Sequence, residues 1–394
     1  AYRRLIEDEI ARLGRHLTPE ELRDILLESI WGVERERDAC YITEFSLILT
    51  LLNYVDRGDM LGLRSRFFPA LHNRRIFHGD FFDFQGKRTE RNFWHAAPRF
   101  DCIVGNPPWI ELKPSTEGEE FAGAWLADPA NKAKRPVAGN RVAEIFSWVV
   151  TDLLRPDGII GLVLPATSLF NRESRHYRRR FFTAHDVLRV TNFANLRDVL
   201  FDRRTTYPAA TVVYRPTIDP EDKPPILHYA PLGIDQPSGV QNRPWALTIN
   251  EGEIQTLSPY EAADGDALLW KLALWGTPLD RRAIERIEVL FPGSLSEVCS
   301  RSHWAFCEGP QLRSGEEYRA RGRLVDLEYV PELEGQRRLD TDLMRESGRR
   351  FSVPTEALDN IPDDQRWIRK RGGKAGLALT PGPHLVLSPS WMSY

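Results

Sequence analysis

Apolar residues in the first half of the chain alternate between helical spacing and short continuous runs. Helical spacing is present in the segments 1–13, 18–29, 37–52, 144–154 and 172–183. Short apolar runs, typical of buried strands, are present in the segments 30–34, 75–80, 100–105, 159–164, 187–193 and 210–214. The second helix has a well-defined start, because Thr18 caps it, Pro19 takes its first position and Glu21 closes a capping box. Strands that alternate with helices predict an α/β fold, with a mostly parallel, doubly wound sheet covered on both faces.

Three of the predicted strands end in a polar residue, namely Glu34, Asp80 and Asn106. In a doubly wound sheet, ligands bind in the crevice at the carboxyl ends of the strands. The sequence therefore predicts a ligand site that these three side chains share.

The pattern changes after Thr217. Prolines interrupt the next segment at positions 220, 224, 225, 231, 237 and 244, so regular elements are expected to be short there. Residues 266–290 have the spacing of a helix pair, and the remainder mixes short strands, turns and basic stretches. We expect a first domain over residues 1–216 and a second, mixed α+β domain over residues 217–394 that is itself incomplete.

The composition is that of an ordinary globular protein, with 42% hydrophobic and 28% charged residues among 394. No apolar run approaches the roughly 20 residues of a membrane span, and no leader of the secretory kind is present. We therefore expect a cytoplasmic protein with no membrane partner. The net charge is −3, so any binding to nucleic acid must use local basic patches.

The cysteines form no C-x-x-C pair. A zinc ribbon or a thioredoxin-type site is therefore not expected. Cys299, His303 and Cys307 could share a metal, but no fourth ligand lies at finger-like spacing. We expect free thiols and no metal site.

The tetrapeptide Asn106-Pro107-Pro108-Trp109 directly follows the strand predicted at 100–105. Proline fixes φ at about −65° and lacks an N–H donor, so the turn is rigid and its carbonyl groups can accept from a ligand. Asn106 adds an amide oxygen, and Trp109 adds a flat face on which a base stacks with about 1–3 kcal/mol. Two acceptors beside an aromatic plate suit a planar group carrying –NH2, since they leave the nitrogen lone pair facing an electrophile. An ordinary Asn-Pro turn is the alternative interpretation.

The segment Phe100–Ile110, FDCIVGNPPWI, resembles the catalytic motif (D/N/S)PP(Y/F/W) of N6-adenine DNA methyltransferases. Further segments follow in the order of the gamma-type subgroup, which includes type IIG restriction-modification enzymes: Gly32–Glu34, His78–Phe81, Leu153–Pro165, Val199–Phe201 and Pro208–Val213. The resemblance covers about residues 20–216. It implies a Rossmann-like class I methyltransferase domain that uses S-adenosylmethionine, followed by a target-recognition domain that binds double-stranded DNA.

The resemblance also implies the roles of individual residues. It assigns catalysis to Asn106, Pro107, Pro108, Trp109 and Phe201, and cofactor binding to Glu34, Asp80, Phe81 and Asn106. The target base is flipped out of the duplex, Phe201 stacks on it opposite Trp109, and methyl transfer then depends on positioning. For Glu34 a helix cap, for Asp80 a turn residue and for Phe201 a core residue are the alternatives.

One element of the family is not found in this sequence. The family places a Gly-containing loop after its first strand, upstream of the segment that contains Glu34, and nothing in residues 1–30 resembles it. We therefore expect the chain to begin after that loop, with an incomplete cofactor pocket, and we expect these 394 residues alone to be inactive.

Two groups of cations are candidates for contact with DNA. In the second domain, two glycines lie among Arg369, Lys370, Arg371 and Lys374, which allows backbone and charge to approach phosphates together. In the first domain, the cluster consists of Arg175, Arg178, Arg179 and Arg180. A solvated helix face is the default interpretation of that cluster. The polar segment 113–136 is expected to be a loop, either a plain mobile one or one that closes over substrate.

These observations favour an adenine-specific DNA methyltransferase of a restriction-modification or similar phage-defence system. A methyltransferase for protein glutamine or RNA is the second hypothesis, because Asn-Pro-Pro-aromatic turns occur there too. A non-catalytic DNA-binding specificity module is the third. The sequence leaves open whether a nuclease domain or subunit accompanies this chain in flanking residues.

Overall fold

The computed structural model describes residues 1–62, 67–87, 92–112, 120–196, 200, 208–233, 246–247, 250–293, 295–302, 312–335, 337–338 and 359–369. The chain forms two compact units, Ala1–Ala283 and Ile284–Tyr394. Each unit is described by itself.

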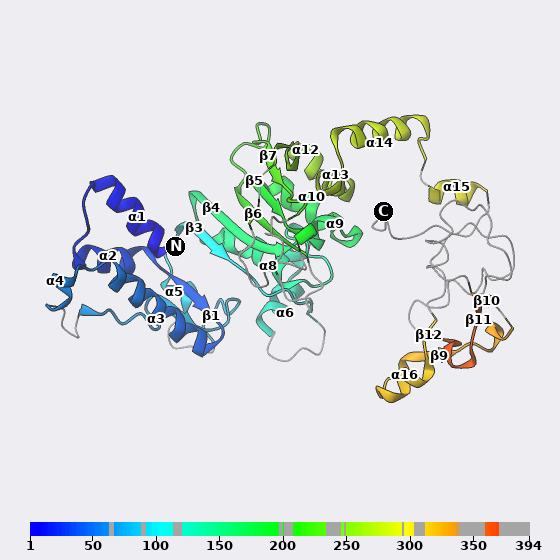
Figure 1. Ribbon diagram of the computed structural model, residues 1–394, viewed down its shortest axis with the longest axis horizontal. Coiled ribbons are helices and arrows are strands. Elements are labelled where there is room, and N and C mark those ends of the chain that lie inside the picture. The colour runs from blue at the N-terminus through cyan, green and yellow to red at the C-terminus, as the bar shows by residue number, and fades with distance from the viewer. Residues whose placement is uncertain are drawn as a thin grey trace, which may run out of the picture. The chain divides into compact units, whose positions relative to one another are not determined.

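The first unit begins with a small helical layer around a parallel strand pair (Figure 1). Its elements are α1 (Tyr2–Leu13), α2 (Pro19–Ser29), β1 (Gly32–Glu34), α3 (Arg37–Asn53), α4 (Arg57–Met60) and β2 (Ile76–His78). The predicted capping box is confirmed, since the Thr18 side chain accepts from the Glu21 N–H and the Glu21 carboxylate accepts from the Thr18 N–H. The helices share a core that includes Ile6, Leu22 and Leu51.

The main sheet has six strands in the order β3-β4-β6-β5-β7-β8 (Figure 1). The strands are β3 (Phe100–Gly105), β4 (Leu154–Pro165), β5 (His185–Asn192), β6 (Ala209–Pro216), β7 (Ile226–Tyr229) and β8 (Ile254–Leu257). Strands β3, β4, β5 and β7 run in one direction, and β6 and β8 run against them. The mostly parallel α/β sheet predicted from the sequence is therefore confirmed.

One face of the sheet is fully buried. Alternate residues of β4 and β6, among them Ile160, Leu162 and Tyr214, are almost inaccessible to solvent. They share one hydrophobic cluster with Trp148 of α8 (Val142–Val149) and Phe181 of α10 (Arg175–Ala184). The remaining helices of this unit are α5 (Phe93–Ala96), α6 (Glu120–Ala127), α7 (Pro129–Lys134), α9 (Thr167–Phe170), α12 (Pro259–Ala263) and α13 (Ala267–Trp275), and α14 (Pro278–Leu290) spans the boundary between the two units.

Two local predictions are wrong. The polar segment 113–136 is not simply a loop, because it contains α6 and α7. Helix α6 is held by Ala122 and Trp125, which are buried at i, i+3 spacing, and α7 starts with Asp128 as cap and Pro129 at the first position. Strand β4 begins earlier than the run predicted at 159–164, because Phe100 pairs with Leu154 and Cys102 with Ile159, so residues 155–158 form a bulge within it.

The sheet extends past the boundary at 216/217 that the sequence suggested. Strand β7 pairs in parallel with β5, and β8 closes that edge, so residues up to Leu257 belong to the same sheet. The compact unit ends at Ala283. The prolines after residue 217 interrupt regular secondary structure, but the first compact unit continues beyond them. The helix pair predicted at 266–290 is confirmed as α13 and α14.

The second unit is small and mixed in its described part. It contains α15 (Leu295–Arg301), α16 (Gly315–Ala320), β9 (Leu327–Tyr329), β10 (Arg337–Arg338), β11 (Asp359–Asn360) and β12 (Trp367–Arg369). Strands β9 and β12 pair antiparallel, as do β10 and β11. Val330, Leu333 and Ile368 form its core.

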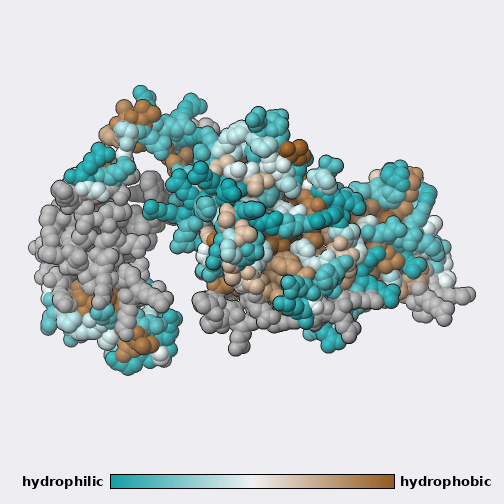
Figure 2. Space-filling view, turned by 180° about the vertical axis from the view of Figure 1, so that it is seen from behind, coloured by the Kyte–Doolittle hydropathy of each residue, from teal (hydrophilic) through white to brown (hydrophobic). Residues whose placement is uncertain are grey.

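Apolar residues also reach the surface of this protein. The C-terminal end of α14, at the upper left of Figure 2, exposes Val289, Leu290 and Phe291, which are 79%, 64% and 70% accessible. Among the helices of the described residues, none has both the length and the apolar character required to cross a membrane.

Candidate active site at the strand ends

The carboxyl ends of β1 and β2 bring Glu34 and Asp80 close together. Glu34 is paired with His78 in the parallel ladder, and the Gly79 N–H donates to the Glu34 carbonyl oxygen over 2.9 Å. Asp80 is the next residue after that bond. The two acids therefore lie at neighbouring strand ends, as the sequence predicted.

Each of the two acids also has a local hydrogen bond. The exposed Glu34 carboxylate accepts the Glu36 N–H over 2.9 Å, just before α3. Asp80 accepts the Phe82 N–H over 2.8 Å, which closes an Asx turn. These backbone bonds orient both carboxylates at the strand ends.

Phe81 packs against the sheet domain next to these acids. Its ring stacks on Phe146 of α8, with centroids 4.4 Å apart and planes 16° apart, and its carbonyl oxygen accepts the Trp94 indole N–H over 2.5 Å. The ring is half-buried, so one part of it faces the core and another remains accessible. Phe81, Trp94 and Ile103 belong to one hydrophobic cluster, which ties the β2 end to β3.

The turn Asn106-Pro107-Pro108-Trp109 leaves β3 with its asparagine facing solvent. Pro107 is buried, and Asn106 and Pro108 are exposed. Among the described residues, the Asn106 side chain has no hydrogen-bond partner. Trp109 is half-buried, and its indole N–H donates to the Val163 carbonyl oxygen over 3.3 Å. The turn is anchored at its proline and its tryptophan, while the amide group stays available.

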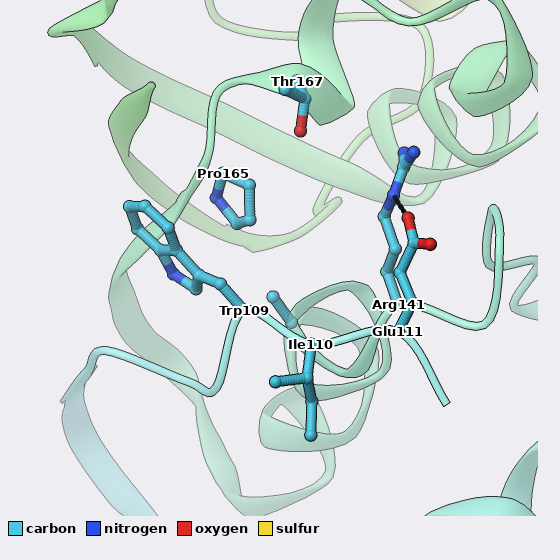
Figure 3. A pocket seen from close by; sticks show the side chains of 7 residues that line it. Trp109, Ile110, Glu111, Arg141, Pro165 and Thr167 are labelled. Carbon is cyan, nitrogen blue, oxygen red and sulfur yellow. Dashed lines mark hydrogen bonds and ion pairs between the residues drawn. The ribbon is translucent and has the colours of Figure 1, made fainter. Parts of the chain in front are cut away.

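A small, partly open pocket lies beside Trp109. Its lining residues are Trp109, Ile110, Glu111, Arg141, Ala143, Pro165 and Thr167. Figure 3 shows Trp109 and Pro165 on one side and the Glu111–Arg141 ion pair on the other. The Trp109 ring on one side and the Glu111–Arg141 pair on the other suit a flat heteroaromatic ring with polar edges.

The pocket also contains polar residues that were not predicted from the sequence. Glu111 and Arg141 line it, and the buried Glu144 lies behind Arg141, with Arg141 Nη1 and Glu144 Oε1 3.6 Å apart. Burial raises the pKa of the Glu144 carboxyl above its usual range, since the neighbouring donors only partly offset the lost hydration. The Gly139-Asn140 pair is the sequence feature that could have revealed this wall, because it is typical of a tight hairpin turn.

The basic cluster of α10 is only partly a surface feature. Arg175, Arg179 and Arg180 are exposed, but Arg178 is 1% accessible. Arg178 donates to the carbonyl oxygens of Ser168, Asn171 and Gly265. Its role is to tie α9 and α12 to α10, so a solvated face or a DNA contact is wrong for this residue.

Several predicted site residues lie outside the described residues, and these are Phe201, Lys370, Arg371 and Lys374. Arg369 is the last residue of β12 in the second unit, opposite Leu327. No cluster of three or more potential metal ligands is found within the part of the chain that the structure describes. His303 and Cys307 lie outside that part.

Both β1 and β3 have an unused edge among the described residues. Strand β1 pairs only with β2, and β3 pairs only with β4. Val104 of β3 is 69% accessible, and Ile42 and Phe45 on α3 are 65% and 63% accessible. Apolar side chains on the strands and covering helices of a doubly wound sheet are normally buried.

A mostly parallel α/β sheet of this topology is Rossmann-like. Residues 28–200 match the model of the Eco57I restriction-modification methylase family. Over 197 residues the chain is 24% identical to the type II restriction enzyme and methyltransferase RM.Eco57I of Escherichia coli. That match covers 48% of this chain and 19% of the relative. The predicted resemblance to restriction-modification methyltransferases is thus confirmed over this segment.

Solved structures of restriction-modification enzymes align with part of this chain at low identity. The ATP-dependent type ISP enzyme LlaBIII bound to DNA is 14% identical, with a TM-score of 0.43, over 69% of this chain and 18% of that chain. The type I methyltransferase subunit from Streptococcus thermophilus is 14% identical, with a TM-score of 0.38, over 64% of this chain and 55% of that chain.

Proposed function

We propose that this chain carries the base-holding part of an enzyme that methylates the N6 amino group of adenine in double-stranded DNA. One observation supports this proposal above the others: the Asn106 amide is exposed on a rigid Pro-Pro turn next to the pocket beside Trp109, and its side chain has no hydrogen-bond partner among the described residues. A side-chain acceptor without an internal partner, beside an aromatic plate, is suited to an amino group of a base.

Asn106 and Pro107 orient the amino group in this proposal. The Asn106 Oδ1 atom and the Pro107 carbonyl oxygen accept its two hydrogens, so the nitrogen lone pair points away from both acceptors. The Trp109 ring holds the base plane, and the hydrogen bond to Val163 fixes the ring in turn. These residues act by positioning the base, an effect that can lower the activation barrier by several kcal/mol.

The residues at the β1 and β2 ends fit S-adenosylmethionine. The Glu34 carboxylate suits the ribose hydroxyls, and Asp80 suits the adenine amino group, since carboxylates accept from both kinds of donor. Phe81 offers a half-buried ring for the adenine plane. When bound, S-adenosylmethionine supplies an electrophilic methyl group.

We propose that a further strand pairs with the edges of β1 and β3, which are free among the described residues. The free edges of β1 and β3, together with the exposed Val104, support this proposal. We propose that the described domain alone transfers no methyl group, and that the full-length protein is active. Methyl transfer by the isolated 394-residue chain at the full-length rate would contradict it.

We place the whole protein in a restriction-modification or similar phage-defence system of the cytoplasm. The E. coli relative is named as both restriction enzyme and methyltransferase, and this chain covers 19% of it. We propose a nuclease domain or subunit outside these residues. We also propose that residues 217–394 contribute to target recognition, with Arg369, Lys370, Arg371 and Lys374 at the DNA backbone.

Transfer of labelled methyl groups tests the substrate class. Full-length protein is incubated with S-adenosylmethionine carrying a tritiated methyl group and with DNA, RNA or protein extract. The proposal predicts label in double-stranded DNA, and loss of that label in Asn106→Ala. Label only in RNA or protein, or DNA binding without any transfer, would overturn it.

A further inference from the structure

Three separate segments form the pocket beside Trp109, and one buried carboxylate connects two of them. The first segment, 109–112, continues from the catalytic turn. The second, 138–144, leads into α8, and the third, 165–174, follows β4. The carboxylate belongs to Glu144, which is 1% accessible and lies at the start of α8.

Glu144 is saturated with hydrogen bonds from the second and third segments. Its Oε2 atom accepts the Ala138 N–H over 2.7 Å. Its Oε1 atom accepts the hydroxyl groups of Ser168 over 2.7 Å and Ser174 over 3.3 Å. A carboxylate held in this way sets the distance between the turn before α8 and the segment after β4.

Arg141 extends the same network to the segment that carries Trp109. Its side chain is 10% accessible. Its Nε atom donates to Glu111 Oε1 over 3.1 Å, and its Nη1 atom donates to Ser174 Oγ over 2.6 Å. The planar guanidinium therefore connects a residue two positions after Trp109 with the Ser174–Glu144 pair.

The backbone places Glu111 and Arg141 opposite each other. Gly139 and Asn140 both have positive φ, 56° and 57°, and the Arg141 N–H donates to the Ala138 carbonyl, which is the geometry of a type I′ turn. The residues that follow this turn pair antiparallel with segment 110–112, because the Leu112 N–H donates to the Asn140 carbonyl and the Val142 N–H to the Ile110 carbonyl. This antiparallel bridge fixes the segment after the catalytic turn against the start of α8.

This arrangement is costly if its purpose is stability alone. Burying a carboxylate and a guanidinium requires dehydrating both, and well-packed apolar residues of similar size often stabilise a fold as well or better. The network lies directly behind the pocket wall opposite Trp109 (Figure 3). Apolar residues in place of Arg141 and Glu144 could not hold the polar side of the pocket, which Glu111 and Arg141 form, in a fixed position.

We propose that Arg141 and Glu144 are positioning residues that hold the wall opposite Trp109, and so set the space into which the flipped target base enters. This inference rests on the proposed function. Neither residue takes part in the chemistry. They fix Glu111 and the Thr167 segment so that a base stacked on Trp109 stays with its amino group at Asn106.

The substitution Arg141→Lys in the full-length protein is the main test. Lysine keeps the charge but cannot bond Glu111 and Ser174 with one planar fork. The target site is first mapped by sequencing methylated plasmid DNA, and a duplex is then made with 2-aminopurine at the methylated adenine. Fluorescence of 2-aminopurine reports base flipping, which a merely structural role would not change in folded protein. Glu144→Gln provides an independent second variant, because it keeps the shape and removes the charge.

We expect Arg141→Lys to lower kcat by about 10- to 100-fold, with the KM for DNA changed far less and the flipping fluorescence reduced. The melting temperature should stay within about 4 °C of the wild type. Wild-type kcat and fluorescence in both variants would overturn the proposal. A kcat loss with unchanged fluorescence would overturn it as well, since the wall would then not govern entry of the base.

A matched control is the Arg155–Asp101 ion pair, with Nη1 and Oδ1 2.7 Å apart. It is exposed and lies at the opposite end of β3 and β4. Arg155→Lys should leave kcat and fluorescence unchanged. If wild-type protein shows no DNA methylation at all, the proposed function fails. If it methylates DNA and Arg141→Lys behaves like Arg155→Lys, only the present inference fails.

Discussion

The indole N–H of Trp109 donates a hydrogen bond to the carbonyl oxygen of Val163, 3.3 Å away on the neighbouring strand. This contact links the turn after β3 to the backbone of β4, so the aromatic plate is held by the sheet itself. The pocket of the proposed target base begins at that plate. The pairing of β3 with β4 therefore sets the orientation of the Trp109 ring without a ligand.

Removing the plate should weaken base binding in the full-length enzyme. Trp109→Ala loses the stacking contact, which is worth about 1–3 kcal/mol per base and corresponds to roughly 5- to 150-fold in kcat/KM. Trp109→Phe keeps a smaller plate and loses the bond to Val163, so its effect should be smaller. Steady-state methylation of DNA measures both. Equal rates for Trp109→Ala and the wild type would exclude a stacking role.

The bulge in β4 should make Gly158 intolerant of a side chain. A Cβ atom there would lie 2.8 Å from the Phe100 carbonyl oxygen and 2.7 Å from the Leu154 side chain. Gly158→Ala should therefore lower the free energy of unfolding by about 1–3 kcal/mol, as measured by urea denaturation.

Gly123 is the matched control for that substitution. It lies within α6, and a Cβ atom there meets nothing within 4 Å. Gly123→Ala should be neutral or raise stability by up to about 1 kcal/mol, because alanine favours the helix. If Gly158→Ala were as well tolerated as Gly123→Ala, the bulge geometry would be wrong.

Two buried histidines should make the fold sensitive to acid. Burial lowers the pKa of His185 to about 3 and that of His228 to about 4. Because these pKa values are below the ordinary value of 6.5, the unfolded chain takes up protons first as the pH falls. The stability contributed by each neutral histidine is present above pH 6.5 and is lost progressively as the pH falls toward 4 and then 3.

Urea denaturation at pH 7 and pH 5 measures this loss. The slope approaches about 1.4 kcal/mol per pH unit for each histidine between the two pKa values. Neither ring nitrogen of His228 has a hydrogen-bond partner among the described residues, so His228→Leu should reduce the pH dependence without exposing a new polar group. A pH dependence identical to the wild type would show that His228 does not titrate in this way.

The basic residues proposed to contact DNA should affect the salt dependence of binding. Each phosphate contact contributes a slope of about −0.9 to log K against log salt on duplex DNA. Lys370→Ala and Arg371→Ala in the full-length protein should each reduce the slope by about one contact. Glu288→Gln, an exposed side chain on α14, serves as a control without a phosphate contact. Slopes that match the wild type in both variants would remove these residues from the DNA interface.

Much of the first domain could be predicted from the sequence because its elements are marked locally. The capping box at Thr18 and the apolar run 100–105 are complete within a few neighbouring residues, and both appear in the structure as expected. The strand-end residues Glu34 and Asp80 could also be predicted, since parallel strands place their carboxyl ends together.

The remaining features depend on pairing between distant segments. Strand β7 pairs with β5 through Leu227 and Arg189, and no local pattern after Thr217 predicts that partner. Arg178 appears in the sequence as one of several surface cations, and only the carbonyl groups that surround it reveal its buried role. Tertiary contacts also create the pocket wall, which is why Arg141 and Glu144 could not be identified from the sequence.

The most direct test concerns the atom that receives the methyl group. Plasmid DNA treated with the full-length protein and S-adenosylmethionine is digested to nucleosides, and N6-methyldeoxyadenosine is quantified by mass spectrometry. The proposed function predicts this nucleoside for the wild type, none above background for Asn106→Ala, and wild-type amounts for the Arg155→Lys control. Methylated deoxycytidine in its place, or undiminished N6-methyldeoxyadenosine from Asn106→Ala, would contradict the central claim that this turn holds the adenine amino group.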